Sequence, residues 1–296
     1  MQGHFMTTST KLKHAGWLLS AVGAFALCGP ALADGPARKP GSIKDAPVEE
    51  PKRDLQITGN FAVTSDYVFR GFSQSAENPT LQAGVDLTYK LFYAGMWVSG
   101  IDFGNDALRP GLDVARVEMD FYAGIKPTLG KLNFDFGGIY YTYPRAFDPG
   151  FVQGAAAVFR ELDYFEFKAG VSTEAWKDGT VGVTVFYSPE YTNDTGPVWT
   201  VEGTLSQVLP KLRDITPTFG ATLGYQTGDD ARYRALVGNG SDDYMYWNVG
   251  MALGFHERFS IDFRYWDTNI SNTANFCSGA TFQCDERFVA TAKVTY

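Results

Sequence analysis

Residues 288–296 read FVATAKVTY and place an apolar side chain at every second position, ending on Tyr296. The opposite phase holds Val289, two threonines and Lys293. Alternation with a period of two is typical of a β-strand that has one apolar and one polar face. An apolar strand face that ends on an aromatic residue resembles the C-terminal signal by which barrel proteins are recognised for insertion into the outer membrane. We therefore expect this stretch to be a membrane strand that contacts the barrel-assembly machinery.

The same alternation occurs eleven more times before residue 288. In the first instance Ile57, Phe61 and Val63 share the apolar phase, whereas Asn60 and Thr64 share the polar phase. In the third instance we assign Trp97, Ile101 and Phe103 to the apolar phase. The predicted strands lie in 55–70, 81–89, 97–103, 115–125, 132–140, 165–171, 181–187, 199–205, 219–225, 245–253, 259–265 and 288–296. The chain is thus predicted to be all-β, with about twelve strands.

Short and long connections alternate along these strands. Short turns are predicted around 92–95, 127–130 and 255–258, and the intervening connections are longer. Transmembrane barrels have this pattern, with long loops outside the cell and short turns in the periplasm. Aromatic residues collect at the strand ends, as in the interfacial girdles of such barrels. We predict an up-and-down antiparallel transmembrane β-barrel, the alternative being a soluble β-fold with an aromatic core.

The composition agrees with this interpretation. The chain has 296 residues, 25 Lys and Arg against 33 Asp and Glu, and a net charge of −8, so a nucleic-acid partner is disfavoured. The mean hydropathy of −0.16 disfavours a helical membrane protein. The chain nevertheless contains 23 Phe, 16 Tyr, 6 Trp and 32 Gly, an unusual set for an ordinary soluble enzyme.

The N-terminus has the order of a secretory signal peptide. Lys11 and Lys13 precede a short apolar run at 17–27, and Ala31-Leu32-Ala33 supplies a site of small residues for cleavage. The alternative, a transmembrane anchor, needs a longer apolar run. We predict a signal peptide at 1–33, a flexible periplasmic lead-in at 34–54 and an outer-membrane β-barrel at 55–296.

Five ordered motifs carry a resemblance to a known family. They are SDYVFRG at 65–71, YAGMW at 93–97, EMD at 118–120, IYYTYP at 139–144 and YSPEY at 187–191. Together they resemble the TorF family of porin-like bacterial outer-membrane proteins, the Gcw_chp family. The resemblance implies a barrel in the outer membrane of a Gram-negative bacterium, but it does not imply a particular solute.

Little in the chain suggests catalysis. The three histidines are His4 and His14, in the predicted signal peptide, and His256, in a predicted periplasmic turn. The Ser–His or His–acid arrangements of outer-membrane hydrolases cannot be built from these residues. We expect no enzyme, no cofactor and no metal site. Cys277 and Cys284 flank residues 278–283 within the last long loop, where an oxidising compartment favours a disulfide over the alternative of two free thiols.

The charged residues of the polar phases are the candidate pore lining. Nine acids exceed six bases, one of which is Lys126, so the lumen is expected to prefer cations weakly. The predicted lining residues are Asp66, Arg70, Asp86, Asp102, Arg116, Glu118, Asp120, Asp135, Glu166, Lys168, Glu202, Asp262, Arg264 and Lys293. Alternatively, these charges pair with one another and fill a narrow barrel.

The sequence therefore predicts a porin-like channel for passive transport of small hydrophilic solutes, embedded in outer-membrane lipid. The alternative function is a closed structural or adhesive barrel that acts through its extracellular loops.

Overall fold

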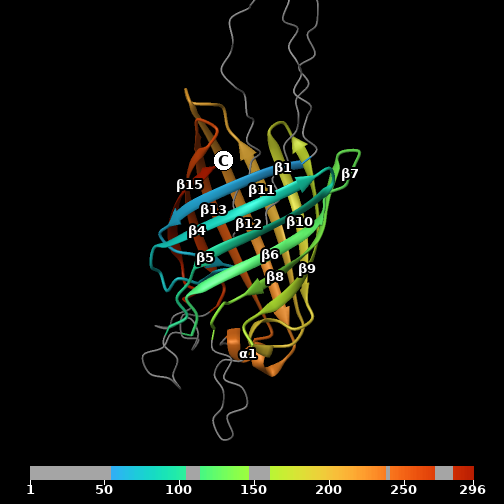
Figure 1. Ribbon diagram of the computed structural model, residues 1–296, viewed down its shortest axis with the longest axis vertical. Coiled ribbons are helices and arrows are strands. Elements are labelled where there is room, and N and C mark those ends of the chain that lie inside the picture. Colours follow the sequence, from blue (N-terminus) through green and yellow to red (C-terminus); the bar gives the residue numbers. More distant parts are fainter. Residues whose placement is uncertain (1–54, 105–113, 147–160, 238–240, 271–282) are drawn as a thin grey trace, which may run out of the picture.

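The computed structural model describes residues 55–104, 114–146, 161–237, 241–270 and 283–296. The predicted signal peptide and lead-in lie outside these residues, as does Cys277. Twelve antiparallel strands form a closed barrel in the order of the chain (Figure 1), which confirms the predicted fold class. The last strand closes the barrel by pairing with the first, with Asn60 opposite Thr295. The barrel strands are β1 (Leu55–Thr64), β4 (Thr80–Tyr89), β5 (Phe92–Gly100), β6 (Val117–Ile125), β8 (Leu132–Thr142), β9 (Tyr164–Trp176), β10 (Gly179–Ser188), β11 (Val198–Val208), β12 (Ile215–Gly228), β13 (Asp243–Phe255), β14 (Phe259–Thr268) and β15 (Arg287–Thr295).

Alternation along the strands separates an apolar outer face from a polar inner face. The side chains of Phe61, Val85 and Phe263 are exposed on the outside, whereas Thr64 and Glu118 are buried on the inside. This arrangement leaves large apolar groups outside and charged groups inside, the reverse of a water-soluble core.

The predicted phase of the third strand is wrong. Trp97 is only 4% exposed, and its ring packs against that of Tyr67 inside the barrel at 5.2 Å between centroids. Ile101 and Phe103, which follow β5, are also buried. The outer face of β5 is made by the smaller apolar residues Met96 and Val98, so this segment is apolar in both phases and its periodicity is ambiguous.

The two ends of the barrel differ. One end has short turns, such as the one that holds His256 between β13 and β14, and the other end has the long connections. Helix α1 (Ala231–Val237) belongs to a long connection and lies with the other long loops at the lower end in Figure 1. No helix in the described ranges has the length and apolar character needed to cross a bilayer.

The first long connection folds into the barrel. It contains a hairpin of two short strands, β2 (Val68–Phe69) and β3 (Phe72–Ser73), which form a sheet of their own. The sequence pattern extends the first strand to residue 70, but the structure ends β1 at Thr64. We call residues 68–73 the hairpin; the loop side of the lumen is the side toward the long connections, and the turn side is the side toward the short turns.

Candidate functional site: the lumen and its inserted hairpin

The hairpin turns at Arg70 and Gly71, and this dipeptide sets its shape. Both residues have positive φ, 49° and 89°, and Phe69 pairs with Phe72 across them. Two central residues with positive φ are typical of the tight turns that match the twist of a β-hairpin. Because glycine adopts this conformation without strain, Gly71 allows a two-residue turn here.

Arg70 at the tip of the hairpin reaches the opposite wall. Its Nη1 and Nη2 atoms donate to the two carboxylate oxygens of Glu166 on β9, each at 2.8 Å. Tyr141 donates a third hydrogen bond to Glu166 at 3.1 Å. The guanidinium also lies 4.7 Å from the ring centre of Phe69 and 4.9 Å from that of Phe186. Planar two-point pairing is the strongest geometry available to arginine and carboxylate, so the pair fastens the hairpin across the lumen.

The base of the same connection is fixed by Asp66. Ser73 and Ser75 donate hydrogen bonds to its Oδ1 atom, at 2.7 and 2.9 Å. Its Oδ2 atom is 3.1 Å from Arg287, the first residue of β15, which also pairs with Asp285 at 2.8 Å. The connection that starts after β1 is therefore held by the last strand of the barrel as well as by β9.

Tyrosine hydroxyls hold the carboxylates on the wall beside the hairpin. Tyr67 donates to Glu118 at 2.7 Å, and Tyr246 donates to Glu202 at 2.6 Å. Burial, followed by the charge of Glu118, raises the pKa of Tyr143 in the loop after β8, so this phenol stays neutral and can donate. Glu118 and Glu202 thus each receive a donor, which lowers the cost of removing them from water.

The turn-side part of the lumen has its own polar pairs. Lys168 lies 2.9 Å from Asp135, which also accepts a hydrogen bond from Tyr93 at 2.7 Å. Asp86 accepts a hydrogen bond from Tyr122 at 2.5 Å. On β14, Arg264 and Asp262 pair at 3.0 Å, and their side chains are 17% and 13% exposed. Asp135, Asp262 and Arg264 keep some contact with solvent, whereas Arg70 and Glu166 are almost fully buried.

The predicted lining residues fall into three groups. Asp66 and Arg70 come from the inserted connection instead of a wall strand. Asp102 and Arg116 lie in the connection between β5 and β6, where they pair at 3.4 Å with side chains 31% and 57% exposed. The remaining ten belong to barrel strands: Asp86, Glu118, Asp120, Asp135, Glu166, Lys168, Glu202, Asp262, Arg264 and Lys293. The tyrosine partners are missing from the predicted lining, because that set contains charged residues only.

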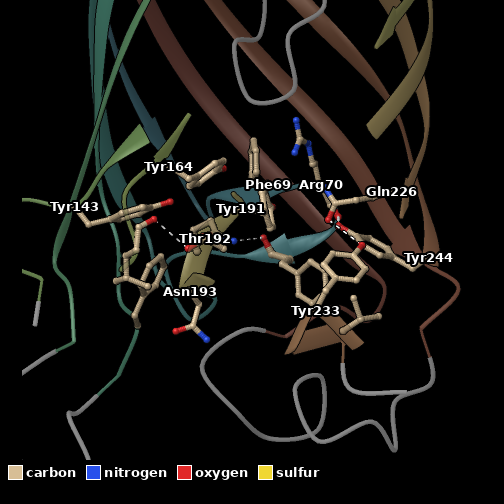
Figure 2. A pocket seen from close by; sticks show the side chains of 15 residues that line it. Phe69, Arg70, Tyr143, Tyr164, Tyr191, Thr192, Asn193, Gln226, Tyr233 and Tyr244 are labelled. Carbon is tan, nitrogen blue, oxygen red and sulfur yellow. Dashed lines mark hydrogen bonds between the residues drawn. The ribbon is translucent and has the colours of Figure 1, made fainter. Parts of the chain in front are cut away.

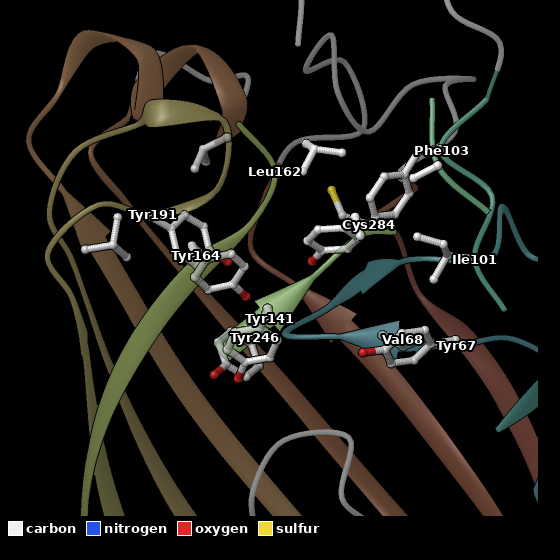
Figure 3. Close-up of a cluster of buried hydrophobic side chains, with 14 of the residues drawn as sticks. Tyr67, Val68, Ile101, Phe103, Tyr141, Leu162, Tyr164, Tyr191, Tyr246 and Cys284 are labelled. Atoms are coloured by element: carbon white, nitrogen blue, oxygen red, sulfur yellow. The ribbon is translucent and has the colours of Figure 1, made fainter. Parts of the chain in front are cut away.

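A pocket of about 90 Å³ lies on the loop side of the hairpin (Figure 2). The hairpin supplies Phe69, Arg70 and Phe72 as part of its lining. The other lining residues come from the long connections and adjoining strand ends: Gln74, Phe103, Tyr143, Leu162, Tyr164, Tyr191, Thr192, Asn193, Gln226, Tyr233, Val237 and Tyr244. Aromatic side chains dominate the walls, and they continue into the buried cluster around the hairpin in Figure 3, which includes Tyr67, Tyr141 and Tyr246.

The remaining chemical candidates lie elsewhere. His256 lies in a turn at the far end of the barrel from this pocket. Cys284 is fully buried near the start of β15, but its predicted partner lies outside the described residues, so the disulfide stays a prediction. In the described ranges, no group of three His, Cys, Asp or Glu side chains is arranged to hold a metal ion.

Comparisons with known proteins give a family and a fold. The model of a family described as "Bacterial protein of unknown function (Gcw_chp)" matches residues 48–296. No curated protein sequence matches the chain. The NanC porin is similar in structure, with a TM-score of 0.50, 10% identity and coverage of 81% of this chain and 99% of that one. The KdgM porin has a TM-score of 0.49 and 8% identity, covering 81% and 98%. LpxR from Salmonella typhimurium has a TM-score of 0.42 and 11% identity, covering 81% and 99%.

Proposed function

The chain belongs to the Gcw_chp family of bacterial proteins, and from this premise we propose that it is a porin-like channel of the bacterial outer membrane. In this proposal small hydrophilic solutes cross the barrel by passive diffusion. The narrower assignment to the TorF family of porin-like proteins is part of the same proposal. Placement of the long loops outside the cell and the short turns in the periplasm follows the general pattern of such barrels.

The observation that supports this function best is the reversal of polarity across the barrel wall. Phe136, Phe167 and Leu223 are 44%, 56% and 52% exposed on the outer face, whereas charged groups such as Glu166 and Lys168 are buried on the inner face. A closed barrel with an apolar exterior satisfies its backbone hydrogen bonds inside a bilayer. Its polar interior offers a route for hydrated solutes.

The hairpin is the proposed constriction of this route. It crosses the lumen, and its Arg70 is only 2% exposed against the wall. Only small solutes are therefore expected to pass, and their rate of passage depends on how far the hairpin moves away from the wall. The predicted excess of acids in the lining supports a weak preference for cations.

Conductance in a planar bilayer tests the channel. The refolded protein is compared with a variant in which residues 68–73 are replaced by a Gly/Ser segment of equal length. We expect small, stable conductance steps from the natural chain and larger steps from the variant, since the variant lacks the constriction. Circular dichroism of both proteins is the control for barrel formation.

A closed barrel that acts as a structural or adhesive platform is the second candidate. It is favoured by the nearly complete burial of Arg70 and Glu166 in the lumen. In the same experiment this function predicts silence from the natural chain and conductance only from the variant without the hairpin. Silence from both proteins, with barrels formed, would reject the channel.

A further inference from the structure

We propose that the pocket on the loop side of the hairpin binds a neutral sugar ring. This inference deepens the proposed channel by naming a class of solute, and to that extent it rests on it. The pocket measures about 90 Å³ and is lined by side chains of the hairpin, the long connections and the adjoining strand ends (Figure 2). Because about 10–15 Å³ holds one water molecule, the space fits several waters or one small ring.

Flat apolar surfaces make up most of the pocket. Phe69 and Phe72 project from the two strands of the hairpin and are only partly buried, so their faces are accessible from the pocket. Phe72 packs edge-on against Tyr244, with 5.4 Å between ring centres, and Tyr191 packs in the same way against Tyr164 at 4.7 Å. These contacts fix the rings before any ligand arrives. Rigid aromatic faces suit a ligand that is itself a ring with an apolar face.

Polar groups at the pocket distinguish a sugar from a hydrocarbon. Gln226 donates to Thr200 at 2.8 Å, accepts from Tyr233 at 3.3 Å and also forms a side-chain hydrogen bond with Tyr191, which leaves one lone pair of its four hydrogen-bonding positions. Gln74 and Asn193 add two further amides to the lining. Amides both donate and accept, as do sugar hydroxyls, so these side chains can exchange hydrogen bonds with a sugar but not with an apolar ligand.

Arg70 adds a second, independent observation. Its Nε–H is buried and has no hydrogen-bond partner in the described part of the chain, although both of its terminal nitrogens bind Glu166. A buried donor without a partner is rare, and a hydroxyl oxygen of a ligand would satisfy it. Because the carboxylate of Glu166 already balances the guanidinium charge, the site offers no net positive charge to an anion. The expected ligand is therefore neutral.

Binding to the full barrel in detergent tests this assignment without reference to conductance. Isothermal titration calorimetry is carried out with glucose, and with sorbitol, glucuronate and phenol as comparison compounds. Glucose is expected to bind saturably, with a Kd of about 1 mM to 10 mM for a ligand of its size. Phe72→Leu keeps the site apolar but removes a flat face, and is expected to weaken glucose binding about threefold to tenfold.

Phe134→Leu is the matched control. Phe134 stacks on Phe136, an exposed side chain of β8 remote from the pocket, so glucose binding should not change. Circular dichroism verifies that both variants fold. Absence of saturable glucose binding overturns the proposal, as does equal binding of ring-less sorbitol, tighter binding of glucuronate, or binding of phenol alone. Conductance without glucose binding would overturn the sugar site but not the proposed channel. Glucose binding without conductance would overturn the proposed channel but not the sugar site.

Discussion

Arg70 and Glu166 face each other in the lumen and form an ion pair in which two guanidinium nitrogens each meet a separate carboxylate oxygen at 2.8 Å. Arg70 belongs to the first long connection and Glu166 to β9, so the pair joins parts of the chain that are 96 residues apart. Neither side chain is more than 2% exposed. Because both charges are removed from water, the loss of either partner leaves the other buried without compensation.

Replacing Arg70 tests whether this ion pair holds the hairpin across the lumen. Arg70→Ala is expected to lower the free energy of unfolding by about 3–5 kcal/mol, the usual cost of breaking a buried ion pair. It should also increase single-channel conductance, because the hairpin is released. Denaturant titration in detergent and bilayer recordings measure the two effects. In Arg232→Ala, which removes an exposed pair with Asp230, the stability should change far less. Unchanged conductance of Arg70→Ala would contradict the role of the pair.

Gly71 provides a second test of how closely the hairpin packs against the barrel wall. Its φ is +89°, and a Cβ atom at this position would overlap the side chain of Thr268. Gly71→Ala should therefore displace the hairpin from the wall, with a cost well above the 1–2 kcal/mol of the backbone conformation alone. Gly130→Ala is the matched control, since Gly130 has φ +63° and open space around the added atom. Equal losses of stability in the two variants would show that the hairpin does not press against Thr268.

Charge selectivity should respond to Asp86. Asp86→Asn retains an oxygen that accepts the hydrogen bond from Tyr122 but removes one negative charge from the turn-side part of the lumen. A unit charge about 6 Å from a passing ion in water changes its energy enough to alter the permeability ratio roughly threefold. Reversal potentials in a potassium chloride gradient should thus shift toward chloride. Asp230→Asn, in an exposed loop, removes the same charge and should leave the ratio unchanged. A natural chain that passes both ions equally would contradict the cation preference itself.

The orientation of Trp97 can be measured by fluorescence. Single-tryptophan variants that retain either Trp97 or Trp199 are inserted into vesicles that contain brominated lipid. Trp199, which is 51% exposed on the outer face, should be quenched strongly, whereas Trp97 at 4% exposure should be quenched little. Strong quenching of Trp97 would restore the phase predicted from sequence.

The predicted disulfide between Cys277 and Cys284 is tested by counting thiols. The secreted chain should show no free thiol after denaturation without reductant and two after reduction, since Cys28 lies in the predicted signal peptide. Closing so short a loop should contribute about 2 kcal/mol of stability, which Cys277→Ser would remove. Two reactive thiols in unreduced protein would disprove the pairing.

Periodicity predicts most of the barrel because the membrane imposes opposite demands on the two faces of each strand. Residues such as Ile57, Phe61 and Val63 alternate with polar neighbours, and the structure places all three on the exposed face. The method fails at β5, where Met96 and Val98 on one phase are as apolar as Trp97 on the other. In the structure, Trp97 pairs with the buried Asp120 of β6 and packs on Tyr67, and both contacts place it inside the barrel.

The candidate site was only partly predictable. Asp66 and Arg70 were selected for their charge, but an alternating pattern cannot show that a loop folds back into the barrel. The Arg70-Gly71 turn between two phenylalanines is a local hairpin signal that could have been recognised. The partner of Arg70 could not be predicted from sequence, because the distance between Arg70 and Glu166 depends on barrel closure. The pocket depends in the same way on loops that meet only in the folded chain.

The contacts of the first connection also bear on the order of assembly. Asp66 meets Arg287, 221 positions later, and the carbonyl of Arg70 accepts a hydrogen bond from Tyr244, 174 positions later. Contacts between such distant parts of a chain form late in folding. We therefore expect the base of this connection, where Asp66 meets Arg287, to be held only after β15 has paired, so a barrel that stalls before this step should leave residues 65–75 accessible to proteases. The time at which this segment becomes protected from proteolysis would therefore report when the barrel closes.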